Sequence, residues 1–292
     1  LGLAGSLAAA APTGALRFDG LPLLFADDSG VGSRQGVVRT LHPARTRAAP
    51  VLEADRPWEG DRVYIYGSVY FDPAQRRYVM WYLARPGLER HGSLSGHGDI
   101  AGLRYDGFDV TLYATSADGV TWEKPAIGRY AYRGSKANNI IFDVHSPSVL
   151  WDQAAADPSA RYKMLGSFPE GYRAAVSPDG IAWHEPVDRA VLEYWDTITL
   201  SHDPRTGEYL AYHKRPAEVR GFKRRVVWLS RSRDFATWSQ PELVLAPDEF
   251  DDQWVTQPQE RTEIYNMSVY PHAAGFIGFP AMFRVQTVRA KE

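Results

Sequence analysis

The sequence contains no cysteine and only 4 methionines among its 292 residues. Without cysteine, disulfide bonds, thiolate metal sites and cysteine nucleophiles are excluded. No apolar run approaches the roughly 20 residues that a membrane-spanning helix needs, so we expect no membrane span. Long apolar patterns with a 3.6-residue period are also absent, and we therefore expect helices to be few and short.

A concentrated basic surface is missing as well. The formal net charge is −2, whereas nucleic-acid-binding domains normally carry a clustered basic face. The run Lys223-Arg224-Arg225 lies where we expect a loop entering a strand, and we interpret it as a solvated turn. No nucleic-acid partner is expected.

Familiar motifs for cofactor and metal chemistry are also lacking. There is no glycine-rich phosphate loop, no Gly-x-Ser-x-Gly elbow and no His-Glu-x-x-His zinc motif. The 8 histidines are scattered singly along the chain. We therefore expect no cofactor and no metal site, and no residue pattern indicates a calcium ion in a central channel.

The chain opens on an apolar, alanine-rich run at residues 1–12. Its small residues of Ala-x-Ala type are typical of the tail of a signal peptide, and the run is too short to span a bilayer. A disordered alanine-rich tail is the alternative. We expect a secreted or periplasmic protein in which residues 1–12 are a remnant of the signal and residues 13–292 form one domain.

A recurring phrase is the most informative feature that is present. It contains Ser, then Asp two residues later, then Trp four residues after the Asp, and its copies recur at a period of roughly 50 to 60 residues, which is typical of propellers and solenoids. Asp-Gly between alternating apolar runs predicts a hairpin turn. We interpret the aspartates as turn formers and the tryptophans as packing residues. The copies begin at Ser116, Ser177 and Ser232 and contain Asp118, Asp179 and Asp234, then Trp122, Trp183 and Trp238.

A second phrase, an Asp-Pro turn between two strands, precedes each copy and contains Asp72, Asp157 or Asp203. Each unit then consists of four antiparallel strands, which is a propeller blade. We place blades at residues 63–126, 139–190 and 195–246, with a partial fourth from Tyr265, and expect a further strand pair within 16–52. This is an all-β, five-bladed propeller type with about three and a half to four blades present. We expect truncation at both ends, the C-terminus included, and completion by another chain is the alternative.

The phrases resemble five-bladed propellers related to the amino-terminal catalytic domain of invertase-type, family 32 glycoside hydrolases, a superfamily that includes arabinanase-like enzymes. The resemblance covers most of residues 20–285 and implies a propeller associated with carbohydrate. The family's Asn-Asp-Pro-Asn-Gly, Arg-Asp-Pro and Glu-Cys motifs are absent, so its catalytic residues are not carried over. The resemblance rests on Pro57-Trp58-Glu59-Gly60, Met80-Trp81-Tyr82, Ser116-x-Asp118-Gly119 with Trp122, Asn138-Asn139-Ile140 and Asp196-Thr197.

Candidate site residues follow from the geometry of a propeller, whose innermost strands border the axis and whose ligands usually bind at one end of it. Glycoside hydrolysis commonly needs an ionised and a protonated carboxyl group. We expect Asp196 to be the ionised group and Glu263 or Glu59 the proton donor. Contacts to the sugar are expected from the aromatic residues Trp58, Tyr64, Tyr66 and Tyr265, and from the polar residues Asn139, His145, Lys214, Arg215 and Arg225.

Two functions remain open at this point. The first is a secreted glycoside hydrolase acting on the end of a saccharide, with a carboxylate pair at the axis. The second is a non-catalytic propeller that binds carbohydrate or protein. The first predicts carboxylates gathered at one end of the axis, and the second predicts that these carboxylates point apart.

Overall fold

The computed structural model describes residues 24–25, 27–28, 31–73, 75–86, 99–103, 109–153, 155–193, 195–272 and 275–286. Antiparallel strands dominate this part of the chain, and the helices in it are two single 3-10 turns, η1 (Pro57–Glu59) and η2 (Pro158–Ala160). The expectation that helices are few and short is therefore confirmed. Within the described residues, no helix is both long and apolar enough to cross a membrane.

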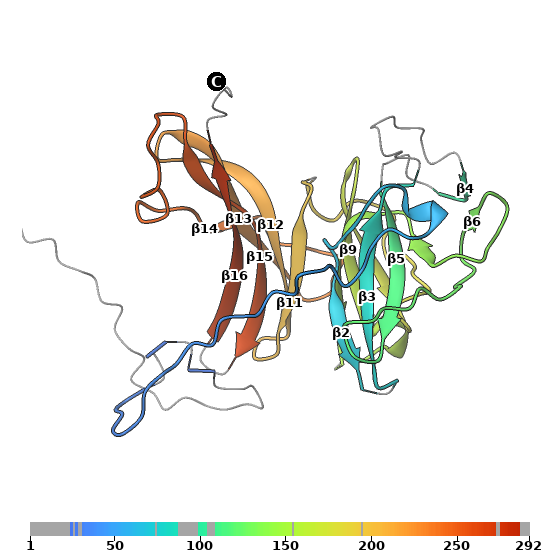
Figure 1. Ribbon diagram of the computed structural model, residues 1–292, viewed down its shortest axis with the longest axis horizontal. Helices are drawn as coiled ribbons and strands as arrows, with labels where there is room; N and C mark the ends of the chain where they lie inside the picture. Colours follow the sequence, from blue (N-terminus) through green and yellow to red (C-terminus); the bar gives the residue numbers. More distant parts are fainter. Residues whose placement is uncertain are drawn as a thin grey trace, which may run out of the picture.

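Four antiparallel sheets form successive blades along the chain (Figure 1). In blade 1 the two short strands β1 (Val63–Tyr64) and β2 (Val69–Asp72) together form the inner position, because both pair with β3 (Arg77–Ala84). A separate small sheet joins β4 (Ile100–Ala101) to β6 (Ala131–Tyr132). Blade 1 contains β1 (Val63–Tyr64), β2 (Val69–Asp72), β3 (Arg77–Ala84), β5 (Val110–Ser116) and β7 (Ile140–Phe142); blade 2 contains β8 (His145–Trp151), β9 (Tyr162–Phe168) and β10 (Gly171–Ser177); blade 3 contains β11 (Ile198–Asp203), β12 (Glu208–Val219), β13 (Phe222–Ser232) and β14 (Glu242–Leu245); blade 4 contains β15 (Arg261–His272) and β16 (Gly275–Val285).

Hydroxyl side chains connect the inner strand of each blade to that of the next. The Ser68 hydroxyl oxygen accepts a hydrogen bond from the backbone N–H of Val149 at 3.0 Å. At the equivalent position of blade 2, Ser148 accepts from the N–H of Leu200 at 2.8 Å. In blade 3 the Thr199 hydroxyl donates to the backbone carbonyl of Met267. The four inner strands are therefore neighbours in chain order, as a radial arrangement requires.

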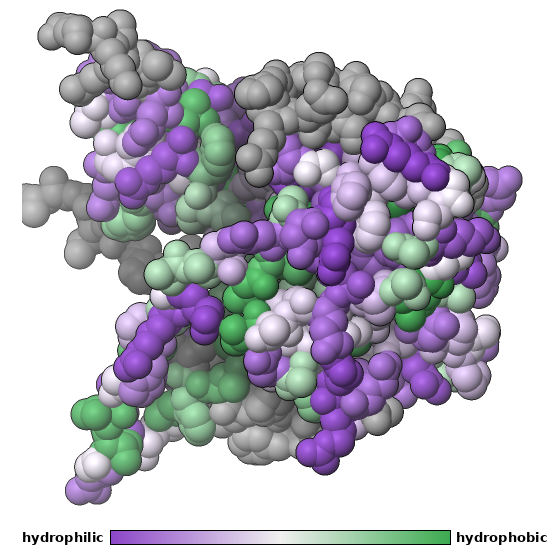
Figure 2. All heavy atoms as spheres, turned by 45° about the vertical axis from the view of Figure 1, so that its right-hand side comes forward, coloured by the Kyte–Doolittle hydropathy of each residue, from purple (hydrophilic) through white to green (hydrophobic). Residues whose placement is uncertain are grey.

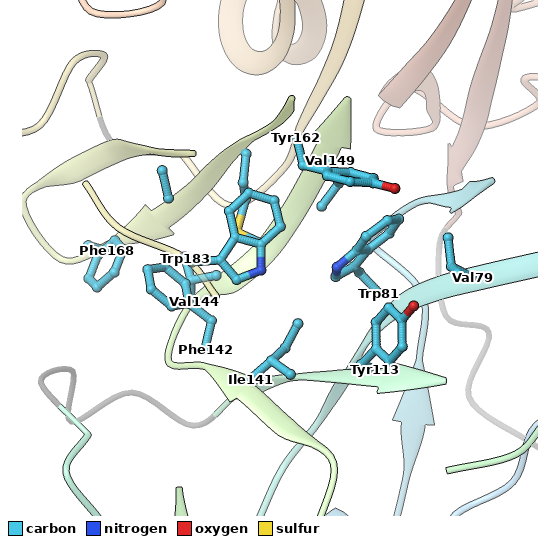
Figure 3. Close-up of a cluster of buried hydrophobic side chains, with 12 residues drawn as sticks. Val79, Trp81, Tyr113, Ile141, Phe142, Val144, Val149, Tyr162, Phe168 and Trp183 are labelled. Atoms are coloured by element: carbon cyan, nitrogen blue, oxygen red, sulfur yellow. The ribbon is translucent and has the colours of Figure 1, made fainter. Parts of the chain in front are cut away.

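The core lies in layers between consecutive blades. Between blades 1 and 2, Trp81 is fully buried, and Figure 3 shows it beside Tyr113 and Tyr162, with Trp183 facing the same cluster. The Trp81 indole N–H donates to the backbone carbonyl of Gly180 at 2.7 Å, so it connects β3 to the Asp-Gly turn of the next blade. Similar layers contain Leu165 and Tyr172 between blades 2 and 3, and Ile264 between blades 3 and 4.

The repeated Ser-x-Asp phrase forms the same turn three times, which confirms its structural interpretation. In the first copy Ser116 Oγ donates to Asp118 Oδ1 at 2.9 Å, and that carboxylate accepts from the N–H groups of Val120 and Thr121. The other two copies repeat these bonds. Gly119 and Phe235 occupy the same left-handed position, at φ 74° and 62°. The phrase therefore tolerates a side chain where its third copy lacks glycine.

The boundary between blades 1 and 2 differs from the expected one. After β5 the chain passes through the first Ser-x-Asp turn, and Glu123 forms an isolated bridge to Thr115 of β5. The outer strand that pairs with β5 is β7, which lies beyond residue 126, the expected end of blade 1. Two hydrogen bonds place β7 there: the backbone carbonyl of Asn139 accepts from the N–H of Tyr113 in β5, and the Asn138 side chain accepts from the N–H of Ile140. Blade 2 therefore begins at His145 rather than at residue 139.

The ring of blades is open, as expected for an incomplete propeller. Large apolar side chains are exposed on the first and the last of these four blades, including Phe279 at 64% and Tyr270 at 49% on blade 4 and Phe71 at 46% on blade 1. Figure 2 shows hydrophobic groups gathered along the hollow between the two sides of the molecule. Residues 31–52 form no strand, so the expected strand pair is absent from that part, while residues 1–12 and 16–23 lie outside the described residues.

The basic run at residues 223–225 is not a solvated turn. It lies within β13, where alternate side chains point to opposite faces. The Arg224 side chain is only 2% exposed and pairs with Asp252 at 2.8 Å, and it also donates to the backbone carbonyls of Val219 and Thr262. Arg224 is therefore a buried connection between β13 and the segment leading into β15.

Candidate functional site

Tyrosine and histidine side chains from blades 1, 2 and 4 meet where the inner strands begin. The Tyr66 ring lies 5.5 Å from that of Tyr64, 5.9 Å from the His145 imidazole and 6.3 Å from the Tyr265 ring, measured between centroids. These contacts join residues far apart in sequence, so the starts of these strands converge. We call the axial cluster the set Tyr64, Tyr66, Arg85, Asp109, His145, Asp196, Lys214, Arg225, Glu263 and Tyr265.

Asp196, just before β11, is the most exposed carboxylate of the axial cluster, with 36% of its side chain accessible. Its Oδ1 forms an ion pair with Lys214, and its Oδ2 accepts a hydrogen bond from the Tyr265 hydroxyl at 3.1 Å. The Lys214 ammonium also lies 3.8 Å from the centre of the Tyr265 ring. Burial lowers the pKa of Lys214 in spite of the attraction of Asp196. Burial and the nearby Asp196 charge both raise the pKa of Tyr265.

Glu263 lies within β15 and is only 3% exposed. Its Oε2 accepts from Arg225 and its Oε1 from Arg261, each at 2.8 Å. The Arg225 guanidinium carbon lies 5.5 Å from the Tyr265 ring and 5.1 Å from the Phe283 ring. Because guanidinium groups occupy both of its oxygens, Glu263 positions two arginines and is poorly placed to donate a proton.

Asp109 and Arg85 complete the cluster and were not expected from the sequence. Asp109 Oδ2 lies 2.5 Å from Nδ1 of His145, while its Oδ1 accepts from Arg85 Nε at 2.7 Å and from the Tyr64 hydroxyl. Burial acts to raise the pKa of Asp109, but hydrogen bonds from His145, Arg85 and Tyr64 outweigh it and hold this pKa below its ordinary value. The buried carboxylate therefore fixes the His145 ring by one nitrogen.

The antiparallel order of the strands in blade 1 could have located both Asp109 and Arg85. Strands β1, β3 and β5 are antiparallel, and Ala84 at the end of β3 pairs with both Val63 and Val110. The start of β1, the end of β3 and the start of β5 therefore lie at the same end of the sheet. Arg85 follows β3 and Asp109 precedes β5, so neither lies just before an innermost strand, where the acidic site residues were expected.

Two β-bulges lie beside the side chains of the axial cluster. The β8–β9 ladder shifts register between His145 and Ser148, and Ser146 has φ 53°. The β15–β16 ladder shifts between Ile264 and Met267, next to Tyr265. Bulges bend a strand and redirect its side chains, and they are common next to functional sites. The two bulges therefore explain why the side chains of His145 and Tyr265 are directed toward Tyr66.

Three expected site residues belong to a different, structural cluster. Glu59 is fully buried, and its carboxylate accepts from the Tyr82 hydroxyl at 2.7 Å, from Lys124 and from two backbone N–H groups. Asn139 is also fully buried; it donates to the Tyr82 hydroxyl and accepts from the Trp58 indole N–H at 2.7 Å. In the described part of the chain, no hydrogen bond or ion pair links Glu59, Asn139 or Trp58 to Asp196. Glu59 and Asn139 thus anchor η1 to blade 1.

Arg215 also points elsewhere. It neighbours Lys214 on β12, and successive strand residues face opposite sides of a sheet. While Lys214 reaches Asp196, Arg215 pairs with Glu193 at 2.6 Å and lies over the Trp228 ring at 5.5 Å. Of the 12 expected residues, Asp196, Glu263, Tyr64, Tyr66, His145, Lys214, Arg225 and Tyr265 are brought together. As for metals, the described residues contain no group of three or more His, Asp or Glu arranged to hold an ion.

Fold and cluster together define the class: an all-β propeller, open after its fourth blade, with charged and tyrosine side chains gathered where its inner strands begin. No protein-family model and no curated protein matches the chain. Its fold is similar to solved structures at low identity, and these include members of the family that the repeat phrases resemble.

One such structure is a fructofuranosidase from Schwanniomyces occidentalis, with 13% identity, TM-score 0.41, and coverage of 66% of this chain and 35% of that one. A second is the GH32 β-fructofuranosidase of Bombyx mori, with 12% identity, TM-score 0.42, and coverage of 75% and 40%. A third is an N-acetylgalactosamine deacetylase from F. plautii, with 15% identity, TM-score 0.41, and coverage of 74% and 71%. The chain thus spans about a third of the length of the first of these proteins.

Proposed function

We propose that this protein is a glycoside hydrolase that binds the end of a saccharide at the axial cluster, with Asp196 as its ionised catalytic carboxylate. One observation carries the proposal: Asp196 is a partly exposed carboxylate, paired with Lys214 and bonded by Tyr265, at the point where the inner strands converge. A base or nucleophile must be a carboxylate that a bound sugar can reach, and the accessible side chain of Asp196 meets this requirement.

The surroundings of Asp196 suit a sugar. The rings of Tyr66 and Tyr265 lie 6.3 Å apart, and both side chains are partly buried. Aromatic rings can pack against the C–H faces of a sugar, while the hydroxyl, ammonium and guanidinium groups around them can bond its hydroxyls. The axial cluster therefore combines stacking surfaces with donors on both sides of one carboxylate.

His145 is the best-placed proton donor. Glu59 and Glu263, the two glutamates expected for this role, are engaged in buried ion pairs. The Asp109 carboxylate holds Nδ1 of His145, which leaves Nε2 available for proton transfer. In the proposed reaction Asp196 acts as base or nucleophile, and His145 protonates the glycosidic oxygen as the bond breaks. Water supplies the hydroxyl of the new reducing end and the proton that restores His145.

A panel of aryl glycosides tested against the 292-residue chain checks this proposal. We expect release of the aryl alcohol from at least one glycoside, and a loss of at least about 100-fold in rate for Asp196→Asn. The matched control is Asp188→Asn, because Asp188 has a fully exposed side chain and pairs with Arg173 away from the cluster. Equal activity of Asp196→Asn and wild type, with both folded, would disprove the role of Asp196.

Non-catalytic carbohydrate binding is the second candidate. The observation that favours it is the engagement of Glu59 and Glu263 in ion pairs, which leaves Asp196 without a glutamate partner for acid catalysis. It predicts saccharide binding without turnover, and binding that survives Asp196→Asn. Export from the cytoplasm remains a proposal that rests on residues 1–12 of the sequence.

A further inference from the structure

Positive charge exceeds negative charge around Tyr265. Lys214, Arg225 and Arg261 face two carboxylates, those of Asp196 and Glu263. Lys214 is matched by Asp196, so two guanidinium groups share Glu263. Once Arg261, which borders the axial cluster, is counted, one of these three cations has no carboxylate of its own among the described residues.

Arg225 is the arginine of this pair with spare bonding capacity. Its side chain is 40% exposed, against 24% for Arg261. One terminal nitrogen, Nη1, donates to Glu263, while the described hydrogen bonds include none from its Nε or Nη2. A guanidinium carries five N–H donors in a rigid planar fork. Arg225 can therefore bind a second oxyanion without releasing Glu263.

The orientation of this fork is fixed by its neighbours. The Arg225 guanidinium lies close to the rings of both Tyr265 and Phe283, and its bond to Glu263 prevents free rotation. The same Tyr265 bonds the Asp196 carboxylate. An anionic group on a sugar bound beside Asp196 would thus reach a preoriented cation, and this lowers the entropic cost of binding.

Balancing the charge of Glu263 does not require Arg225, because Arg261 already forms a hydrogen bond with the other oxygen of this carboxylate at 2.8 Å. Arg225 also repels the nearby Lys214 ammonium. Burial is the main cause of the lowered pKa of Lys214, and the charge of Arg225 lowers this pKa further. A ligand that carries negative charge would relieve this repulsion. A neutral sugar would not.

We propose that the saccharide is acidic and that Arg225 binds the carboxylate of a uronic acid unit. This inference names the substrate class of the proposed carbohydrate site and rests on that function. A sulfate ester offers the same kind of oxyanion, and the experiment below distinguishes the two.

The test is the affinity of the 292-residue chain for matched methyl glycosides, measured by titration calorimetry. Methyl glucuronide and galacturonide are compared with methyl glucoside and galactoside, and with the 6-sulfates of the two neutral sugars. We expect at least one uronide to bind about tenfold or more tightly than its neutral counterpart, and we expect this preference to weaken at high salt. A preference for the sulfates over the uronides would overturn the carboxylate assignment.

Variants of β13 assign the preference to one side chain. Arg225→Gln should abolish it, so that uronides bind this variant no more tightly than their neutral counterparts do; it is expected to fold because Arg261 still pairs with Glu263. Arg231→Gln is the control, since Arg231 lies on the same strand, is also 40% exposed and forms one ion pair, with Glu242. Arg231→Gln should keep the full preference.

The outcomes separate this inference from the proposed function. If neutral glycosides bind as tightly as uronides, or if Arg225→Gln keeps the preference, the acidic substrate is refuted while carbohydrate binding stands. If uronides bind through Arg225 but no glycoside is hydrolysed, the inference holds and the hydrolase assignment fails. If none of these glycosides binds, both are refuted.

Discussion

Tyr66 and Tyr265 lie with their ring centroids 6.3 Å apart, although one belongs to the first blade and the other to the fourth. Tyr66 also contacts His145 of the second blade, and Tyr265 bonds Asp196 at the start of the third. These contacts bring the beginnings of all four inner strands together. The convergence unites the His145–Asp109 pair with the Asp196–Lys214 pair in one candidate site.

The structural role of Glu59 can be tested by Glu59→Gln. Removing this buried charge weakens the ion pair with Lys124, whose side chain is only 4% exposed, so we expect a loss of about 2–4 kcal/mol in the free energy of unfolding. Urea denaturation measures this loss. Activity or ligand binding per folded molecule should stay unchanged, because Glu59 lies outside the axial cluster.

A neighbouring glutamate supplies the control for this experiment. Glu123 has a 68% exposed side chain and pairs with Arg77 at the surface. Exposed pairs contribute little, so Glu123→Gln should change stability by less than about 1 kcal/mol. A stable Glu59→Gln protein that had lost its activity would instead restore Glu59 as a catalytic candidate.

Two glycines in equivalent turns should respond differently to replacement by alanine. Both have a left-handed backbone, with φ 74° at Gly119 and 75° at Gly180. A Cβ at Gly119 would meet Tyr78 at an ordinary 3.5 Å, whereas a Cβ at Gly180 would lie 2.6 Å from Cζ2 of the buried Trp81.

Gly119→Ala should therefore cost about 1 kcal/mol, which is the backbone strain alone. Gly180→Ala should cost about 3 kcal/mol, because the Trp81 ring must also move within a packed core. Thermal unfolding of both variants measures the difference. Equal destabilisation would show that Trp81 adapts without cost.

Acidification should destabilise the protein through His213. Burial lowers the pKa of this histidine to about 4, whereas an unfolded histidine titrates near 6.5. Between these values the unfolded state binds more protons than the folded state, so stability falls as the pH falls from about 6.5 to about 4. The contribution lost is roughly 3 kcal/mol.

The unfolding temperature measured from pH 7 to pH 4.5 tests this expectation. His213→Gln can keep a hydrogen bond to Ser230 but cannot be protonated, so its unfolding temperature should depend less on pH in this range. His184→Gln, at an exposed position, should retain the wild-type dependence. An unchanged pH dependence in His213→Gln would rule out a titration of His213 on unfolding.

Local patterns predicted the blades because their causes are local. The Ser-x-Asp turn closes through hydrogen bonds between residues at most three positions apart, as Asp118 shows with Val120 and Thr121. The same reasoning placed His145 and Asp196 near the axis, since each lies at or just before the start of an inner strand, and it also placed Tyr265, which lies four residues into β15. The strand β7 was missed because its pairing with β5 depends on a chain excursion that leaves no periodic signal.

Local sequence patterns predicted most of the strands, the repeated turns and the strands that border the axis, because periodicity and turn chemistry act between residues that are close along the chain. Which charged side chains stay accessible depends on long-range packing. Glu59 and Arg224 are buried by segments far away in sequence, and Asp109 of the first blade contacts His145 of the second. The burial of a charged side chain depends on what packs against it from elsewhere in the fold, and no local pattern records that.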